Sequence, residues 1–331
     1  MAATHVPIFL LHRADSFQFD PLLPRSFFRP IPNTPSSSLS AAHRHSAISF
    51  GSRLGATIAP NRNRKPPAST MALGNPLVSD ICATALTGSI ALFLLRFWGE
   101  IAKQGFLHQT LNRKLVHVSI GLVFMLCWPL FSSGHQGAIL AALVPGINII
   151  AMLLLGFGIM KDEAMVKSMS RSGNYRELLK GPLYYAATIT LACIIYWRTS
   201  PISIAAICNL CAGDGFADII GRRFGSCKLP YNRNKSVVGS AAMAAASLLA
   251  SIGYMYYFSS FGFVQASWEM FMGFLVVTLA STLVESLPIS TDIDDNLTVP
   301  LTSILVGTLV SDSRSWELLA LISCRAVKSL L

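Results

Sequence analysis

Long apolar runs alternate with short polar segments from residue 77 onward. A helix that crosses the hydrocarbon core of a bilayer needs about 20 predominantly apolar residues, and most of these runs approach that length. The pattern therefore predicts an all-α polytopic membrane bundle with about seven to nine transmembrane helices. The predicted spans are Leu77–Leu95, Leu115–Phe131, Ala138–Met160, Gly181–Trp197, Ile202–Ile220, Val238–Phe258, Met270–Leu287 and Val299–Val310, with Trp316–Leu331 as an interfacial helix or a further span.

The polar segments divide into two kinds. Arg96–Lys114, Lys161–Lys180 and Gly221–Lys235 each carry four or five basic residues, whereas intervening segments such as Ser132–Gly137 carry almost none. Basic loops stay on the side from which a membrane protein is inserted. Strict alternation places every basic segment on one side, which we expect to be the stroma or cytosol, together with the acidic segment Pro288–Asn296.

The first 70 residues have a different composition. They are rich in serine, proline and arginine, as in the run Pro32–Ser40, and their eight basic residues face only Asp15 and Asp20. This composition predicts a disordered chloroplast transit peptide over residues 1–70, ahead of an integral membrane domain over residues 71–331. A disordered cytosolic tail is the alternative.

The overall composition excludes a soluble protein and a nucleic-acid binder. The chain is 52% hydrophobic and 13% charged, whereas soluble domains carry about 25% charged residues. The net charge of +10 comes from the first 70 residues and the loops beside spans, as membrane topology requires. The seven cysteines are scattered. Cys208-x-x-Cys211 has no second pair, so helix packing explains it better than zinc or redox chemistry.

Two aspartates lie in a stretch that otherwise resembles a membrane span. Pro201–Gly221 is apolar except for Asp214 and Asp218, and an ionisable group at mid-membrane costs about 2.5–3.5 kcal/mol. Their spacing places both carboxylates on one helix face, at the basic edge of the membrane. Such a pair suits Mg²⁺, which binds one or two carboxylates plus substrate phosphates. Salt bridges to Arg222 and Arg223 at the helix end are the alternative.

The following segment, GRRFGSCKLPYNRNKSVVGS, combines cations with glycine, asparagine and serine. These groups bind polyphosphate, particularly at the start of a helix. It is not a Walker A loop. An ordinary basic loop is the alternative, but it accounts only for the arginines and lysines. The candidate phosphate-binding residues are Arg222, Arg223, Lys228, Asn232, Lys235, Ser236, Gly239 and Ser240.

An acidic segment is the third candidate. Glu285 lies near the end of a predicted span, and Asp292, Asp294 and Asp295 follow it. Carboxylates here can serve as a second metal contact or as a general base for an alcohol. The glycine and final glutamate of an EF-hand are missing. A solvated acidic loop is the alternative.

His117 is the fourth candidate, in the motif Asn112-Arg113-Lys114-x-x-His117 at the head of a predicted span. It can deprotonate an alcohol or bind phosphate, whereas a histidine with a purely hydrogen-bonding role in its helix is the alternative. Lys161–Lys180 is a weaker candidate for phosphate contact, and a solvated loop is its default interpretation.

Three segments carry a resemblance to a known family. LNRKLVHVSIGLVF, CAGDGFADIIGRRFGSCKLPYNRNKSVVGS and VESLPISTDIDDNLTVP together resemble the plant phytol kinase and farnesol kinase family. They are more distantly similar to dolichol kinases and CDP-diacylglycerol synthases. The resemblance covers approximately Leu77–Val310, and its specific part is D-x-x-x-D-x-x-x-R-R-x-G followed by K-L-x-x-N-x-x-K-S-x-x-G-S.

The resemblance implies a CTP-dependent lipid kinase. Such an enzyme transfers the γ-phosphate of CTP to the hydroxyl of phytol, geranylgeraniol or farnesol, giving the prenyl monophosphate and CDP. Asp214 and Asp218 would then hold Mg²⁺ or another divalent cation, and the phosphate-binding residues would hold CTP. The proton acceptor would be Asp294, Asp295, Glu285 or His117. The expected partners are CTP and a prenyl alcohol in a chloroplast membrane, with the active face toward the stroma and no nucleic acid.

Two other activities fit the same residues. A lipid cytidylyltransferase would attach CMP to a lipid phosphate and release pyrophosphate, using the same metal and cations. A membrane transporter is the non-enzyme alternative, although the charge gathers on one side rather than at the midplane where transporter sites lie. The sequence does not indicate the oligomeric state or the chain length of the alcohol.

Overall fold

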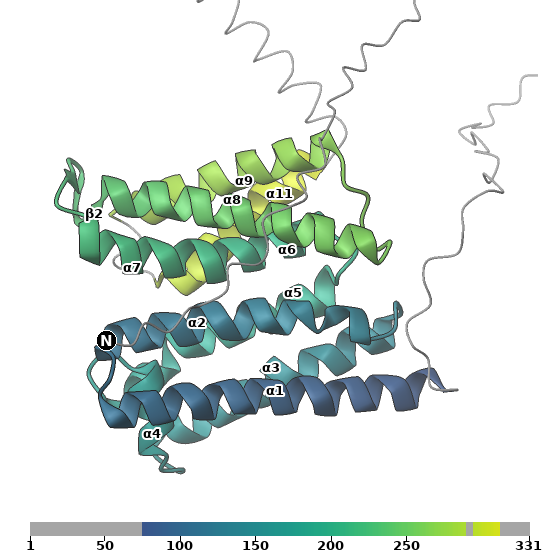
Figure 1. Ribbon diagram of the computed structural model, residues 1–331, viewed down its shortest axis with the longest axis horizontal. Helices are drawn as coiled ribbons and strands as arrows, with labels where there is room; N and C mark the ends of the chain where they lie inside the picture. Colours follow the sequence, from purple (N-terminus) through teal and green to yellow (C-terminus); the bar gives the residue numbers. More distant parts are fainter. Residues whose placement is uncertain (1–74, 289–293, 312–331) are drawn as a thin grey trace, which may run out of the picture. The chain divides into compact units, whose positions relative to one another are not determined.

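The computed structural model describes residues 75–288 and 294–311, and these are mostly helical (Figure 1). The predicted transit peptide and the segment Trp316–Leu331 lie outside the described residues. The elements are α1 (Pro76–Gln104), α2 (Gln109–Leu126), η1 (Trp128–Leu130), α3 (His135–Gly156), α4 (Glu163–Met169), η2 (Tyr175–Leu179), α5 (Gly181–Ile195), α6 (Pro201–Cys208), η3 (Asn209–Gly213), α7 (Asp214–Phe224), β1 (Lys228–Leu229), β2 (Asn232–Ser236), α8 (Val237–Ser260), α9 (Trp268–Ser286) and α11 (Asp295–Ser311).

The prediction of an all-α membrane bundle is confirmed. Within the described residues, seven helical stretches are long and apolar enough to span a membrane, and they begin at Pro76, Gln109, His135, Tyr175, Pro201, Val237 and Trp268. The eighth predicted span lies in the 17-residue helix α11.

A small hairpin departs from the all-helical pattern. β1 pairs antiparallel with β2, and Leu229 lies opposite Asn232. The segment was expected to be a loop because β2 reads NRNKS and contains no apolar residue, whereas strand recognition depends on alternating apolar positions. Hydrogen bonds to neighbouring helices hold the hairpin in place instead.

Serine caps begin several helices. The Ser236 hydroxyl accepts a hydrogen bond from Gly239 N at 3.1 Å, and Ser267 accepts one from Met270 N at 3.2 Å. Ser200 accepts from Ile202 N, with Pro201 at the first helical position. A serine cap satisfies one of the unpaired N–H groups at a helix start, and proline there has no N–H to satisfy.

The fifth span is the centre of the bundle. It runs from α6 through the π-helical turn η3 into α7, and it packs against α2, α8 and α11. In the π-helical turn the Asn209 amide donates hydrogen bonds to Ser303 Oγ at 2.9 Å and Ser281 Oγ at 3.3 Å, and Asn209 Oδ1 accepts one from Thr278. This buried network fixes the central helix to α9 and α11, just before Asp214.

A buried arginine organises the loops between spans. Arg198 donates to the carbonyl oxygens of Trp128 at 2.7 Å and Phe131 at 2.6 Å, and to Ser133 Oγ at 3.1 Å. Its guanidinium lies 3.8 Å from the centre of the Phe263 ring. Burial lowers the pKa of Arg198 to about 10, while Asp80 opposes the shift, so the guanidinium stays charged at neutral pH.

We predict that Arg198→Ala destabilises the bundle. The substitution leaves the two carbonyl oxygens without this donor, and a buried unpaired polar group costs about 1–3 kcal/mol. The melting temperature in detergent should fall by at least about 5 °C, because 1 kcal/mol corresponds to roughly 2–4 °C in a domain of this size. Arg233→Ala, at an exposed hairpin position, is the control. An unchanged melting temperature for Arg198→Ala would show that these contacts contribute nothing.

Candidate active site

Several helix ends meet around one charged cavity of about 960 Å³. Helices α5, α8 and α11 contribute residues from their first turns, and helix N-termini favour anions. The lining residues are Arg113, Lys114, Met169, Arg171, Glu177, Lys180, Gly181, Pro182, Tyr184, Asp214, Ala217, Asp218, Gly221, Arg222, Lys228, Asn234, Lys235, Ser236, Gly239, Ser240, Glu285, Asp294, Asp295 and Leu297.

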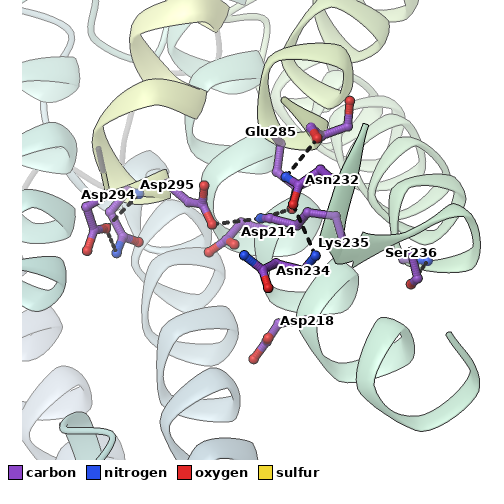
Figure 2. Close-up of polar contacts among 12 residues, drawn as sticks. Asp214, Asp218, Asn232, Asn234, Lys235, Ser236, Glu285, Asp294 and Asp295 are labelled. Atoms are coloured by element: carbon purple, nitrogen blue, oxygen red, sulfur yellow. Dashed lines mark hydrogen bonds and ion pairs between the residues drawn. The ribbon is translucent and has the colours of Figure 1, made fainter. Parts of the chain in front are cut away.

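Most of the residues expected from the sequence line this cavity. They are Asp214, Asp218, Arg222, Lys228, Lys235, Ser236, Gly239, Ser240, Glu285, Asp294 and Asp295. His117, Arg223 and Asn232 are not among the lining residues. Asp292 lies outside the described residues. Figure 2 shows Asp214, Lys235 and Asp295 close together, with Asp218 nearby. The structure thus gathers three of the predicted clusters into one site.

Asp214 is part of a buried ion pair. Its Oδ2 lies 2.7 Å from Lys114 Nζ, and the two residues are only 2% and 6% exposed. Lys114 belongs to α2, whereas Asp214 begins α7. The pair therefore joins two spans, and Asp214 does not form the bridge to Arg222 or Arg223 that was the alternative interpretation.

His117 lies next to the same carboxylate but does not line the cavity. Its Nε2–H donates to Leu210 O at 2.8 Å and lies 3.4 Å from Asp214 Oδ2. The imidazole also packs against the Tyr185 ring, with centroids 4.3 Å apart. Leu210 lies in the π-helical turn, and π-bulges are frequent at functional sites. This placement favours a structural role for His117 beside Asp214.

Asp218 forms the helix-end salt bridge that was the alternative interpretation of its spacing. Its Oδ1 lies 2.7 Å from Arg222 Nε, one turn later on α7. The Asp218 side chain is 22% exposed and that of Arg222 is 58% exposed. An exposed pair of this kind contributes little stability, so it can rearrange for a ligand at little cost.

Lys235 bridges two carboxylates from different helices. Its ammonium contacts Glu285 at the end of α9 and lies 2.9 Å from Asp295 Oδ2 at the start of α11. Burial favours a lower pKa for Lys235, but Asp295 and Glu285 outweigh burial and raise the pKa. Lys235 is therefore a fixed cation that ties the hairpin to α9 and α11.

Only one of the two carboxylate oxygens of Asp295 has a partner among the described residues. Its Oδ2 pairs with Lys235, while Oδ1 is buried and has no hydrogen-bond partner among the described residues. Burial and then repulsion from Asp214 raise the pKa of Asp295 to about 6, while Lys235 opposes the shift. Asp294 differs, because its Oδ1 accepts hydrogen bonds from Asn296 N at 3.0 Å and Asn296 Nδ2 at 2.6 Å.

The hairpin is anchored beside the cavity by Asn232. Its Nδ2 donates to Ser286 O at 3.1 Å, and its Oδ1 accepts from Asn234 N at 3.1 Å.

Close packing of α7 on α8 forms the adjoining side of the cavity. A Cβ on Gly239 would lie 3.1 Å from Ala217 O and 3.2 Å from Gly221 Cα, so a larger residue would push the helices apart. The first turn of α8 is held next to α7 in this way.

Three further cations of the cavity had at most a weak assignment from the sequence. Arg113, Arg171 and Lys180 line the cavity, and no ion pair is found for them, or for Lys228, in the part of the chain that the structure describes. Arg113 stood in the His117 motif, and the other two stood in the loop treated as a weak candidate. Because these residues lie far from Asp214 in the sequence, the sequence alone did not indicate that they line the same cavity.

The charged side chains that line the cavity nearly balance. Seven basic and six acidic side chains of the described residues line it, which gives a formal charge of +1. No group of three or more His, Cys, Asp or Glu side chains that could hold a metal occurs in residues 75–288 and 294–311. Asp214 and Asp218 line the cavity as a pair of carboxylates.

Comparisons with curated proteins find clear relatives. Over 285 residues the chain is 58% identical to "Farnesol kinase, chloroplastic" of Arabidopsis thaliana, a match that covers 86% of this chain and 90% of the relative. Over 242 residues it is 68% identical to "Probable phytol kinase 3, chloroplastic" of Glycine max, covering 73% and 76%. It is 39% identical over 249 residues to "Phytol kinase 1, chloroplastic" of Arabidopsis thaliana, covering 75% and 82%.

No protein-family model matches the chain, and no solved structure matches it.

We predict strong coupling between Lys114 and Asp214. Lys114→Met leaves a buried carboxylate without its cation, and breaking a buried pair costs about 3–5 kcal/mol. Adding Asp214→Asn removes the uncompensated charge, so the double variant should melt at a higher temperature than Lys114→Met alone. Thermal unfolding of the two single variants and the double variant gives the coupling. Additive losses in the double variant would contradict a direct ion pair.

Proposed function

The chain belongs to the family of chloroplast phytol kinases and farnesol kinases and is an isoprenoid alcohol kinase, and we propose that it uses CTP as phosphate donor and releases CDP. One observation carries the site assignment: unpaired cations and helix N-termini surround a buried carboxylate oxygen that has no partner among the described residues. Cations and helix ends bind phosphate, and a free carboxylate oxygen accepts a proton. The relatives' names include both alcohols, so the acceptor is proposed as a long isoprenoid alcohol.

The triphosphate is proposed to lie against the first turn of α8. Ser240 and Gly239 line the cavity there, and Lys228 faces it without a carboxylate partner within the described ranges. Arg113 and Lys180 supply further unpaired charge from α2 and from just before α5. Lys235 and Arg222, expected as ligands from the sequence, first have to exchange their carboxylate partners for phosphate.

Asp214 and Asp218 are the residues proposed to hold Mg²⁺ together with the phosphates. Both line the cavity, and Asp214 is fixed in position by Lys114 and His117. A bound Mg²⁺ neutralises charge on the transferred phosphoryl group. The protein's own contribution is to hold the donor and acceptor in line, which is the main component of catalysis in phosphoryl transfer.

Asp295 is the proposed acceptor of the alcohol proton. Its Oδ1 is unpartnered among the described residues, whereas Asp294 Oδ1 is occupied by Asn296. Glu285 contacts Lys235 as Asp295 does, and His117 does not line the cavity. The buried Oδ1, which has no partner among the described residues, favours Asp295 for the role.

The location is proposed from the relatives and the topology. The matched relatives are named chloroplastic, and residues 1–70 have the composition of a transit peptide. The cavity gathers residues from all three basic segments, and basic segments remain on the side of insertion. We place the protein in a chloroplast membrane with the cavity open to the stroma.

We predict that γ-phosphate, not CMP, moves from CTP to the alcohol. Purified protein is incubated with farnesol, geranylgeraniol or phytol and with CTP labelled at the γ or α position, with ATP in parallel. Label from γ-labelled CTP should enter the lipid, and CDP should accumulate. Lipid labelled from the α position would instead support a cytidylyltransferase. Solute flux without CDP release would support a transporter, and a preference for ATP would contradict the CTP proposal.

We predict an acidic limb in the pH profile that depends on Asp295. A general base must be ionised, so kcat/KM should fall as the pH drops through about 6, the folded-state pKa of Asp295. Asp295→Asn should lower kcat by about 10²–10⁴-fold, as expected for loss of a general base, and should remove that limb.

Asp294→Asn is the matched control for Asp295→Asn. It removes charge one residue away, from a carboxylate that is already hydrogen-bonded to Asn296, so the acidic limb should persist. The reverse result, with the limb lost in Asp294→Asn and kept in Asp295→Asn, would move the base to Asp294.

A further inference from the structure

One corner of the cavity is apolar. Apart from Met169, the rest of the lining is charged, polar or small, whereas Pro182, Tyr184 and Leu297 line the cavity from the first turns of α5 and α11, two helices that pack against each other. Asp294 and Asp295 lie at the start of the same α11 turn. The acidic part of the site is therefore next to the apolar corner, which is what an alcohol with a long hydrocarbon chain requires.

Contacts between α5 and α11 place Tyr184 on the seam between them. A Cβ on Gly181 would lie 3.2 Å from Asp294 Oδ2, and Thr188 Oγ1 donates to Asn296 O at 3.3 Å. Gly181, Tyr184 and Thr188 follow i, i+3, i+7 spacing and so share one face of α5. Because the first and last of these contact the start of α11, Tyr184 lies along the same seam.

An exposed apolar stripe continues from Leu297 along α11. Leu297, Leu301 and Leu305 are spaced four residues apart and lie on one face. Leu301 is 54% exposed and Leu305 is 63% exposed. At 1.5 Å per residue the stripe extends about 12 Å from the cavity into the helix, in the direction an isoprenoid chain must take to stay in the hydrocarbon.

Exposure to lipid alone does not distinguish this stripe. Leu249 on α8 is 70% exposed, but it does not line the cavity. The α11 stripe differs because its first residue, Leu297, lines the cavity together with Asp295. It is continuous with the polar site, whereas Leu249 only faces outward.

We propose that the isoprenoid chain binds in the seam between α5 and α11, with Tyr184 and Leu297 as specificity-determining contacts and Leu301 and Leu305 along the distal chain. This proposal deepens the proposed function and rests on it for the position of the hydroxyl, next to Asp295. The nucleotide reaches the cavity from the aqueous side, and the alcohol reaches it sideways from the bilayer. Each substrate thus stays in the phase where it dissolves.

Leu297→Trp tests the seam directly. A bulky ring at the cavity end of the stripe should raise the KM for farnesol about tenfold or more, because a pocket discriminates about 10–200-fold for a single methylene. Tyr184→Ala should also raise it. The KM for the nucleotide should change by less than about twofold, since those contacts lie elsewhere in the cavity. Each KM is measured with the donor that the wild-type protein uses, so failure of the CTP proposal does not affect this test.

Tryptophan substitutions at different positions distinguish a specific effect on the seam from a general loss of folding or activity. Leu305→Trp should raise the KM for the C20 alcohols phytol and geranylgeraniol more than the KM for the shorter alcohol geraniol. Leu297→Trp should raise the KM for all of these alcohols. Leu249→Trp makes the same substitution on an exposed helix face away from the cavity and should change neither KM. Melting temperatures identify any variant that fails to fold, and Leu297→Met then replaces Leu297→Trp as a milder probe. Equal effects of Leu249→Trp and Leu297→Trp, or a changed KM for the nucleotide alone, would overturn the proposal.

Discussion

The buried ion pair between Lys114 and Asp214 is the contact on which the rest of the site depends. Each charge alone would cost about 2.5–3.5 kcal/mol if it lay deep in the membrane. Pairing at 2.7 Å offsets that cost and fixes α2 to the central span. His117 and the carbonyl of Leu210 support the pair from the bundle interior, and the Asn209 network holds the same span to α9 and α11. The charged end of the bundle is thereby held in one arrangement.

The charges around the cavity divide into two groups with different roles. Lys114 and Lys235 pair with carboxylates from other helices and hold the helices and the hairpin together, whereas Arg222 pairs with Asp218 within α7. Arg113 and Lys228 have no such partner within the described residues and are available to phosphate. The buried Lys114–Asp214 pair fixes its part of the site before substrates bind, which lowers the entropic cost of positioning two substrates for transfer.

Hydropathy and charge predicted most of the fold, because spans are long and the bilayer imposes one length on all of them. The sequence also selected Asp214, Asp218 and Asp295 as candidates, since carboxylates near a span need a reason to be there, and the structure brings all three to the cavity lining. It could not predict the partner of Asp214, because Lys114 lies 100 residues away. It assigned His117 to chemistry, whereas the structure buries the ring behind Asp214. The hairpin escaped recognition because its five-residue strand has no apolar pattern.

The central claim is that this cavity binds the phosphate donor through its unpaired cations, and nucleotide affinity measures that most directly. We predict that Arg113→Gln/Lys228→Gln weakens equilibrium binding of CTP by at least about 100-fold, since hydrogen bonds to charged groups contribute about 1.5–3 kcal/mol each. Arg233→Gln, an exposed hairpin position outside the cavity lining, should bind CTP like the wild type. Wild-type affinity in the double variant would contradict the assignment of this cavity as the donor site.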